Sequence, residues 1–381
     1  MRIALSGWFW QRPETGSGQY VRRLLAALSR LQPESEFWVL LPTTLPSEEA
    51  PAARNVASIL VHAPPTALGK VWWEQVAVPR AARRLGVDVL HVPYWAPPLW
   101  PGAPTVVTVH DLIPLLLPDY RGGAAVRLYT SLVRAATPHA TLLLTDSEAS
   151  RQDILHHLRV PAERVQAVHL AADDVYTPTP EPGDNRVLGE FGLDPGYVLY
   201  LGGFDVRKNL RGLFDAFAWV HKALDQARLV VAGKLPARDT DFAPDPRRLA
   251  WEAGLPDGRV RFIGSPPEAS KPALYRGARA FVFPSRYEGF GLPPLEALSC
   301  GVPVVGSCAT SLPEVVGNAG VLTDPADAAG MSGALIQILN DDGFYHELRQ
   351  CAICQARKFS WTVTAQKTFA AYRQAVERRT A

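Results

Sequence analysis

Short apolar runs that alternate with helical patterns constrain the fold of this chain most. The first half contains RIALSGW, FWVLLP, VASILVH, VDVLHV, TVVTVHD, TLLLTDS and RVQAVHL, and the second half contains YVLYLGG, ARLVVAGK, VRFIGS, AFVFPS, PVVGS and GVLTD. Helical patterns such as GQYVRRLLAALSRL, WWEQVAVPRAARRLG and NLRGLFDAFAWVHKAL separate some of them. Near-continuous apolar strands between helices are typical of parallel sheets that are covered on both faces. The sequence therefore predicts an α/β fold with two doubly wound, Rossmann-like units.

The length of 381 residues fits two or three domains, at roughly 150 residues per domain. The segment DDVYTPTPEPGDNR, residues 173–186, is rich in proline and charge, as linkers tend to be. We therefore predict an N-terminal domain over residues 1–175 and a C-terminal domain over residues 187–360. A last helix, over about 361–381 with Ser360 as its N-cap, is expected to pack back on the first domain. The carboxyl ends of both sheets are expected to face a central cleft.

Composition excludes several classes of function. The net charge of +2 is too small for the basic surface of a nucleic-acid-binding protein. The start, MRIALSGWFW, lacks the apolar region of a signal peptide, and no apolar run approaches roughly 18 residues. We expect a cytoplasmic protein, with peripheral contact at the inner face of a membrane left open. The C-x-x-C of Cys351 and Cys354 has no partner at metal-site spacing, so we interpret it as buried thiols on a helix.

The segment YEGFGLPPLE, residues 287–296, interrupts an apolar region with two acids and two glycines. A strand is predicted to end at Pro284 and a helix to begin at Pro293 or Pro294. Backbone N–H groups between them suit a phosphate or a sugar oxygen. Glu296, predicted in the first turn of that helix, is able to accept two hydroxyl hydrogens of a sugar diol. The alternative is a plain turn, with Glu296 complementing the helix dipole.

A second loop, in YVLYLGGFDVRKNLRGLFDAF, follows a strand that ends in Gly202 and Gly203. Arg207 and Lys208 precede a helix that we expect Asn209 to cap, and such a pair beside a helix N-terminus fits a diphosphate. A solvated basic pair is the alternative. The G-x-G-x-x-G spacing of a dehydrogenase is not present in this loop.

Two segments of the first half also lie where a loop meets a predicted strand or helix. In TGSGQYVRRLL, Gly16 and Gly18 are predicted to lie just before a helix, where backbone N–H groups would reach a phosphate or an acceptor. In TVVTVHDLIPLLLP, His110 and Asp111 follow an apolar strand. His110 is a candidate to hydrogen-bond a sugar hydroxyl. The alternatives are a common two-glycine turn, and a packed His110 beside a helix-capping Asp111.

Taken together, these segments resemble glycosyltransferase family 4, the retaining sugar-nucleotide transferases with the two-domain GT-B fold. The resemblance rests on the E-x7-E segment PSRYEGFGLPPLEALSCGVPVV with TSLPEVVGNAGVLTDP, on LYLGGFDVRKNL, LVVAGK and VRFIGS, and on GSGQYVRRLL, HDLIP and TDSEASRQDI. It covers nearly the whole chain and is most similar to mannosyltransferases of bacterial polysaccharide assembly.

The resemblance implies a role for each matching residue. Glu288 and His110 would contact the donor sugar, and Arg207 and Lys208 the diphosphate. The other donor-binding positions would be the backbone at Gly289, Phe290, Gly291 and Leu292, the ribose contact Glu296, the residues Phe262, Ile263 and Ser265 near the base, and the glycines Gly203, Gly16 and Gly18. Many members carry Arg where this chain has Gly203, which weakens the transfer of phosphate-binding detail.

The resemblance also implies the reaction. A hexose would pass from a nucleotide-diphosphate sugar, GDP-mannose in the first instance, to a glycan or lipid-linked acceptor. UDP-glucose and UDP-N-acetylglucosamine are alternative donors, and a non-catalytic sugar-nucleotide binder, an epimerase or a phosphorylase are alternative functions. No metal or other cofactor is expected. The segment PRAARRLG, residues 79–86, is a candidate membrane-contacting helix, and the alternative is a solvated helix face. The segment KVWWEQ, residues 70–75, is a candidate lining of the acceptor site, and the alternative is that its tryptophans pack in the core.

Overall fold

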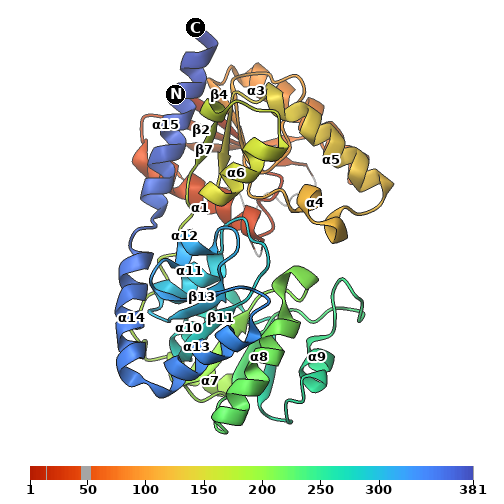
Figure 1. Cartoon of the computed structure of the whole chain (residues 1–381). Helices are drawn as coiled ribbons and strands as arrows, with labels where there is room; N and C mark the ends of the chain where they lie inside the picture. Colours follow the sequence, from red (N-terminus) through yellow and green to blue (C-terminus); the bar gives the residue numbers. More distant parts are fainter. Residues whose placement is uncertain (14, 44–52, 381) are drawn as a thin grey trace. The chain divides into compact units, whose positions relative to one another are not determined.

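Two parallel sheets, each in its own unit, contain every apolar run that the sequence predicts as a strand (Figure 1). The computed structural model describes residues 1–13, 15–43 and 53–380. The first unit consists of Met1–Leu170 and Ser360–Ala381, and the second of Ala171–Phe359. The chain thus leaves the first unit just before the predicted linker, and a helix already begins within that linker, at Asp184.

The sheet of the first unit has the order β3-β2-β1-β4-β5-β6-β7 with parallel neighbours. Its strands are β1 (Arg2–Ser6), β2 (Glu36–Pro42), β3 (Val56–Val61), β4 (Val89–Val92), β5 (Thr105–Thr108), β6 (Leu142–Thr145) and β7 (Val165–Ala167). The sheet of the second unit has the order β10-β9-β8-β11-β12-β13, also parallel. Its strands are β8 (Tyr197–Leu201), β9 (Leu229–Ala232), β10 (Val260–Gly264), β11 (Ala278–Phe283), β12 (Val304–Ser307) and β13 (Gly320–Thr323). Every residue of β4, β5, β6 and β8 is buried, as expected of strands covered on both faces.

Helices cover both sheets. Those of the first unit are α1 (Gly16–Leu31), α2 (Ala67–Trp72), the π-helix η2 (Trp73–Ala77), α3 (Val78–Leu85), α4 (Ile113–Leu116), η3 (Pro118–Tyr120), α5 (Ala124–Ala136), η4 (Thr137–His139), α6 (Glu148–His157), η5 (Ala162–Arg164) and α15 (Trp361–Thr380). Those of the second are α7 (Asp184–Glu190), η6 (Val206–Lys208), α8 (Leu210–Ala223), α9 (Pro246–Glu252), η7 (Glu268–Ser270), α10 (Lys271–Gly277), α11 (Leu292–Ser299), α12 (Leu312–Val316), α13 (Ala328–Asn340) and α14 (Asp342–Ala356).

The C-terminal helix α15 packs against α1 and strands of the first unit (Figure 1). The side chain of Ser360 accepts a hydrogen bond from the backbone N–H of Val363, as predicted for its N-cap. Further along α15, the hydroxyl of Tyr372 lies 2.7 Å from Nδ1 of His91, and Nε2 of His91 lies 2.9 Å from Oγ1 of Thr108. Burial lowers the pKa of His91 to about 3, so this ring is neutral and satisfied by one partner on each nitrogen.

Three details of the predicted elements are wrong. The helix predicted at WWEQVAVPRAARRLG is interrupted by η2. Helix α1 begins at Gly16, so Gly16 and Gly18 lie in its first turn rather than before it, and Thr15 caps it by accepting from the N–H of Gly18. The C-x-x-C does lie on a helix, α14, but Cys351 is only half-buried and Cys354 is exposed.

Within the described residues, no helix combines the length and the apolar character that crossing a membrane requires.

Candidate active site

Glu288 lies in the loop between β11 and α11 and pairs with two cations. Its Oε1 atom lies 2.6 Å from Nζ of Lys208 and 2.7 Å from Nη1 of Arg207. Both cations belong to η6, which follows β8. Since β8 and β11 are parallel neighbours, their carboxyl ends lie at one edge of the sheet. The structure therefore brings together three of the residues that the sequence predicts for the donor site.

The charges of this cluster stabilise one another. Burial by itself would raise the pKa of Glu288, but Lys208 and Arg207 outweigh it and hold the pKa below its usual value. All three side chains are about one-eighth exposed. Nζ of Lys208 also lies 4.9 Å from the centre of the Phe283 ring, and Nε of Arg207 lies 3.5 Å from Asp205. The cluster thus holds an ionised carboxylate beside two partly accessible cations.

Thr310 and Ser311, which the sequence interpretation did not single out, hold the Glu288 loop in place. The backbone N–H of Glu288 donates to Oγ1 of Thr310 at 3.0 Å, and Oγ of Ser311 donates to the carbonyls of Glu288 and Phe290. Thr310 has a left-handed backbone, with φ of 54°, which is uncommon for a β-branched residue. Both residues follow β12, so their place after a strand was the available signal.

The loop leads directly into α11. This helix begins at Leu292, one residue before the predicted start, and Gly291 precedes it with φ of 117°. No side chain caps the helix. Pro293 and Pro294 have no N–H group and the N–H of Leu295 donates to the carbonyl of Gly291, so in the first turn only the N–H of Leu292 is left to face an anion. The side chain of Phe290 is buried and packs edge-on against Phe359, 5.9 Å away between ring centres. Gly289 lies between these residues and Glu288.

Glu296 lies in the second turn of α11, not in the first as predicted, and its surroundings differ from those of Glu288. Its side chain is buried, and its Oε2 atom accepts a hydrogen bond of 2.8 Å from the hydroxyl of Tyr275. Burial raises the pKa of Glu296 to about 7, although Lys271 and Tyr275 oppose the shift. A carboxyl group with this pKa exchanges its proton near neutral pH.

Other predicted donor-site residues need correction. Asn209 occupies the N-cap position of α8, but its side chain does not cap the helix. It bridges two loops instead, by donating to the carbonyls of Pro284 and Pro325. Of the residues predicted near the base, Phe262 and Ile263 lie within β10, as the strand prediction for VRFIGS implies, and only Ser265 follows the strand.

Gly203 lies after β8, and its carbonyl accepts a hydrogen bond from the hydroxyl of Tyr200. A Cβ atom at this position would meet only the carboxylate of Asp205, at 3.3 Å. A side chain here would therefore require Asp205 to shift slightly.

In the first unit, His110 follows β5 and is held by Asp146, which follows the neighbouring β6. Nδ1 of His110 lies 2.7 Å from Oδ2 of Asp146, and Nε2 lies 3.2 Å from the carbonyl of Pro93. The ring of Tyr20, from α1, meets that of His110 edge-on at 4.9 Å. Burial lowers the pKa of His110, but Asp146 outweighs it and raises the pKa above its ordinary value. Two acceptors facing the two ring nitrogens fit an imidazolium.

Asp111 accepts a hydrogen bond from the N–H of Ile113, the first residue of α4, but it lies one residue before the N-cap, Leu112, so the alternative of a capping Asp111 is wrong. The two glycines of α1 differ in what surrounds them. A Cβ atom on Gly18 would lie 1.9 Å from the carbonyl oxygen of Arg12, so packing alone requires glycine there. A Cβ atom on Gly16 would meet nothing within 4 Å, so this position borders open space.

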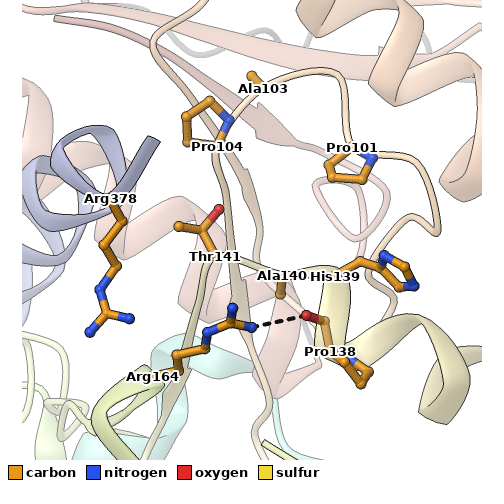
Figure 2. A pocket seen from close by; sticks show the side chains of 9 residues that line it. All are labelled: Pro101, Ala103, Pro104, Pro138, His139, Ala140, Thr141, Arg164 and Arg378. Carbon is orange, nitrogen blue, oxygen red and sulfur yellow. Dashed lines mark hydrogen bonds between the residues drawn. The ribbon is translucent and has the colours of Figure 1, made fainter. Parts of the chain in front are cut away.

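A pocket of about 460 Å³ lies at the opposite, amino edge of the sheet of the first unit, around the starts of β5 and β6 (Figure 2). Its lining consists of Pro101, Ala103, Pro104, Pro138, His139, Ala140, Thr141, Arg164 and Arg378. Because parallel α/β sheets bind their ligands at the carboxyl ends of the strands, we do not assign this pocket to the candidate site. Among residues 1–13, 15–43 and 53–380, no three His, Cys, Asp or Glu residues are grouped as metal ligands.

Comparisons with known proteins cover both units. Residues 15–176 match the model of Glycosyltransferase Family 4, and residues 186–359 that of Glycosyl transferases group 1. The chain is 36% identical over 272 residues to O-antigen chain mannosyltransferase B of Escherichia coli, with 70% of each chain covered. It is 32% identical over 265 residues to the serotype-specific mannosyltransferase WbdA of Escherichia coli, of which it spans about a third.

Solved structures share the fold. Sucrose-phosphate synthase from Thermosynechococcus elongatus has a TM-score of 0.77 at 23% identity, with 98% of both chains covered. Anabaena HepE, solved in complex with UDP and glucose, has a TM-score of 0.72 at 19% identity, covering 98% of this chain and 100% of that one. Both sheets and their strand orders therefore belong to the GT-B architecture.

Replacing Glu296 by Gln is expected to stabilise the protein at alkaline pH. The folded protein favours protonated Glu296, so the stability from this group is full below the ordinary pKa of 4.5 and is lost as pH rises through about 7. Above that pH, ionised Glu296 lowers the free energy of unfolding by an amount on the order of 3 kcal/mol, and a neutral Gln avoids this loss. The difference in melting temperature, Glu296→Gln minus wild type, should grow from pH 5 to pH 8. Exposed Glu190→Gln is the control, and a difference that is constant with pH contradicts the assignment.

Replacing Asp146 by Asn is expected to lower the pKa of His110, because the opposing charge 2.7 Å from Nδ1 is removed. An NMR titration of the imidazole signals measures this directly. The signal of exposed His139 should behave alike in both proteins. An unchanged His110 titration would show that Asp146 does not set its charge.

Proposed function

Because this chain belongs to glycosyltransferase family 4, we propose that it transfers a hexose, with retention at the anomeric carbon, from a nucleotide-diphosphate sugar to a glycan or lipid-linked acceptor. The observation that carries the proposal is the ionised Glu288 held between Arg207 and Lys208 at the carboxyl edge of its sheet. GDP-mannose is the proposed donor, and polysaccharide assembly the proposed setting, since the relatives at 36% and 32% identity are named O-antigen chain mannosyltransferase B and serotype-specific mannosyltransferase WbdA.

The cluster provides the chemistry that breaking a glycosidic bond requires. As the bond to the diphosphate lengthens, negative charge grows on the leaving oxygens and positive charge on the sugar ring. Arg207 and Lys208 would stabilise the diphosphate with N–H groups that are already aimed and partly desolvated. The backbone N–H of Leu292, at the start of α11, would add to this stabilisation.

The carboxylate of Glu288 has a different role in this proposal. It would accept hydrogen bonds from donor-sugar hydroxyls, while its own charge keeps both cations in place before the donor binds. His110, held by Asp146, would exchange the 3.2 Å contact between its Nε2 and the Pro93 carbonyl for a hydroxyl of the hexose, and Glu296 would accept from the ribose diol. We assign no covalent nucleophile and propose front-face displacement through an oxocarbenium-like state, without a metal ion or another cofactor.

The first test is a thermal-shift and calorimetric screen with GDP-mannose, GDP, UDP-glucose, UDP-N-acetylglucosamine and UDP, in EDTA. A ligand that binds only the folded protein raises its melting temperature. We expect the GDP compounds to raise it and the UDP compounds not to. A shift with UDP compounds alone would replace GDP-mannose by one of the alternative donors. Binding without turnover of any acceptor would favour a sugar-nucleotide binder that is not an enzyme.

Glu288→Gln and Lys208→Met are each expected to lower kcat/KM for transfer by at least about 100-fold, because each removes a charged group that acts on the donor. Steady-state kinetics with the identified donor measures the effect. Lys222→Met, an exposed lysine at the end of α8, is the matched control and should stay within about twofold of wild type. Circular dichroism verifies the fold, and wild-type turnover in Glu288→Gln would overturn the residue assignment.

We also propose that the first unit contacts an anionic membrane surface. A groove of about 500 Å³ lies between edge strand β3 and the helices α2, η2 and α3, and is lined by the apolar Leu60 and Trp72 and by Arg80 and Arg84. Leu60 is 53% and Trp72 37% exposed. Exposed apolar side chains flanked by arginine match the chemistry of an anionic lipid interface.

Reversing Arg80 and Arg84 to Glu is expected to weaken binding to phosphatidylglycerol vesicles by at least about tenfold, at roughly 1 kcal/mol per basic residue. Co-sedimentation at low and high salt measures it. The control reverses Lys222 and Arg228 of the second unit, which are exposed. Failure of the wild-type protein to bind such vesicles at low salt would disprove this contact.

A further inference from the structure

A buried polar network in the first unit takes no part in the donor chemistry described above. Nζ of Lys70 lies 2.6 Å from Oε1 of Glu74 and 2.7 Å from the hydroxyl of Tyr129. That hydroxyl in turn lies 2.9 Å from Oε2 and 3.1 Å from Oε1 of Glu74. The side chain of Glu74 is fully buried, whereas that of Lys70 remains 26% exposed. We call these three residues the Lys70 cluster.

The Lys70 cluster is built on an unusual helical turn. Glu74 lies in η2, a π-helix between α2 and α3, and π-turns often occur where a function needs a side chain redirected. Trp73, the preceding residue, is fully buried, and its indole N–H donates to Oγ of Ser6, the last residue of β1. Tyr129 comes from α5, so the cluster joins two helices far apart in the sequence.

The cluster lies at the same sheet edge as His110. Oγ of Ser6 lies 3.2 Å from the hydroxyl of Tyr94, which follows β4, and Nζ of Lys70 lies 5.5 Å from the centre of the Tyr94 ring. The residue before Tyr94 is Pro93, whose carbonyl faces Nε2 of His110. A continuous set of contacts thus joins the cluster to the histidine that we assign to the transfer step.

The charges in the cluster cancel. Lys70 supplies one cation and Glu74 one carboxylate, whose pKa burial raises although Lys70 opposes the shift. Tyr129 is neutral, since burial and the neighbouring Glu74 both raise its pKa. Lys70 gives two of its three N–H donors to Glu74 and Tyr129, and within the described residues the third has no partner. A hydrogen-bond donor without net charge is therefore presented at this edge.

We propose that the Lys70 cluster is an acceptor subsite for an uncharged sugar, whose hydroxyl accepts the third N–H of Lys70. The inference rests on the proposed function and adds the class of acceptor to it. The half-buried Trp8 lies 5.7 Å from the ring of Trp73, the residue before Glu74. A phosphorylated acceptor group is disfavoured here, because Glu74 already neutralises the cation.

Two probe acceptors test the charge argument, octyl α-mannoside and its 6-phosphate. Glu74→Gln keeps the size of the side chain but leaves the Lys70 cation without its counter-charge. The ratio of kcat/KM for the neutral probe to that for the phosphorylated one is expected to fall by at least about tenfold. A purely structural ion pair would lower both activities together and leave this ratio unchanged, which would overturn the proposal.

Lys70→Met provides the second measurement. We expect KM for octyl α-mannoside to rise about tenfold, as for a lost hydrogen bond to a charged donor, with the calorimetric Kd for the donor unchanged. Exposed Lys367→Met on α15 is the control in the same unit. If Glu74→Gln does not fold, Tyr129→Phe keeps the packing and should raise the same KM about fivefold. An unchanged KM in Lys70→Met would disprove the subsite.

The proposed function and the subsite fail in different ways. A wild-type protein that binds no nucleotide sugar disproves the proposed function. Direct titration of octyl α-mannoside into wild-type protein and Lys70→Met, by saturation-transfer NMR, then still tests the subsite. Equal binding to both proteins, or binding to neither, would overturn it.

Discussion

The burial of both parallel sheets is the constraint on which the rest of this structure depends. Every residue of β4, β5, β6 and β8 is buried, so these strands carry their functional groups only beyond their ends. Parallel neighbours end at one edge, which gathers loops that are distant in the sequence. The pairs His110 with Asp146, and Lys208 with Glu288, arise in this way, across 36 and 80 residues of chain.

The two glutamates of the E-x7-E segment show how tertiary surroundings set the character of one residue type. Glu296 is buried and Glu288 is about one-eighth exposed, and burial alone raises the pKa of either. Glu288 has two cations within 2.7 Å and stays ionised, with a pKa below its usual value. Glu296 has a tyrosine hydroxyl as its close partner, and its pKa rises to about 7. One carboxylate is thus prepared as a fixed charge, and the other as a group whose proton is exchangeable near neutral pH.

Both units contain a largely buried ion-pair cluster, and the two clusters differ in the groups that they leave for a ligand to bind. The Glu288 cluster sets two cations against one close carboxylate, which suits an anionic diphosphate. The Lys70 cluster pairs one cation with one carboxylate, so it offers a hydrogen-bond donor without net charge. On these proposals, the chain binds a charged donor at the Glu288 cluster and an uncharged acceptor at the Lys70 cluster. Neither balance is visible in the overall net charge of +2.

The sequence by itself determined the strands, the α/β class, the family and the loops that carry the candidate residues, because apolar runs and strand-end loops are local patterns. Only the tertiary structure decided that Thr310 and Ser311 clamp the Glu288 loop, that Asp146 holds His110, and that Asn209 bridges two loops instead of capping α8. It also opened a π-turn at Glu74. These features depend on pairs of residues 22 to 116 positions apart, or on packing that shifts a helix by a residue. Local propensity carries no information about such partners.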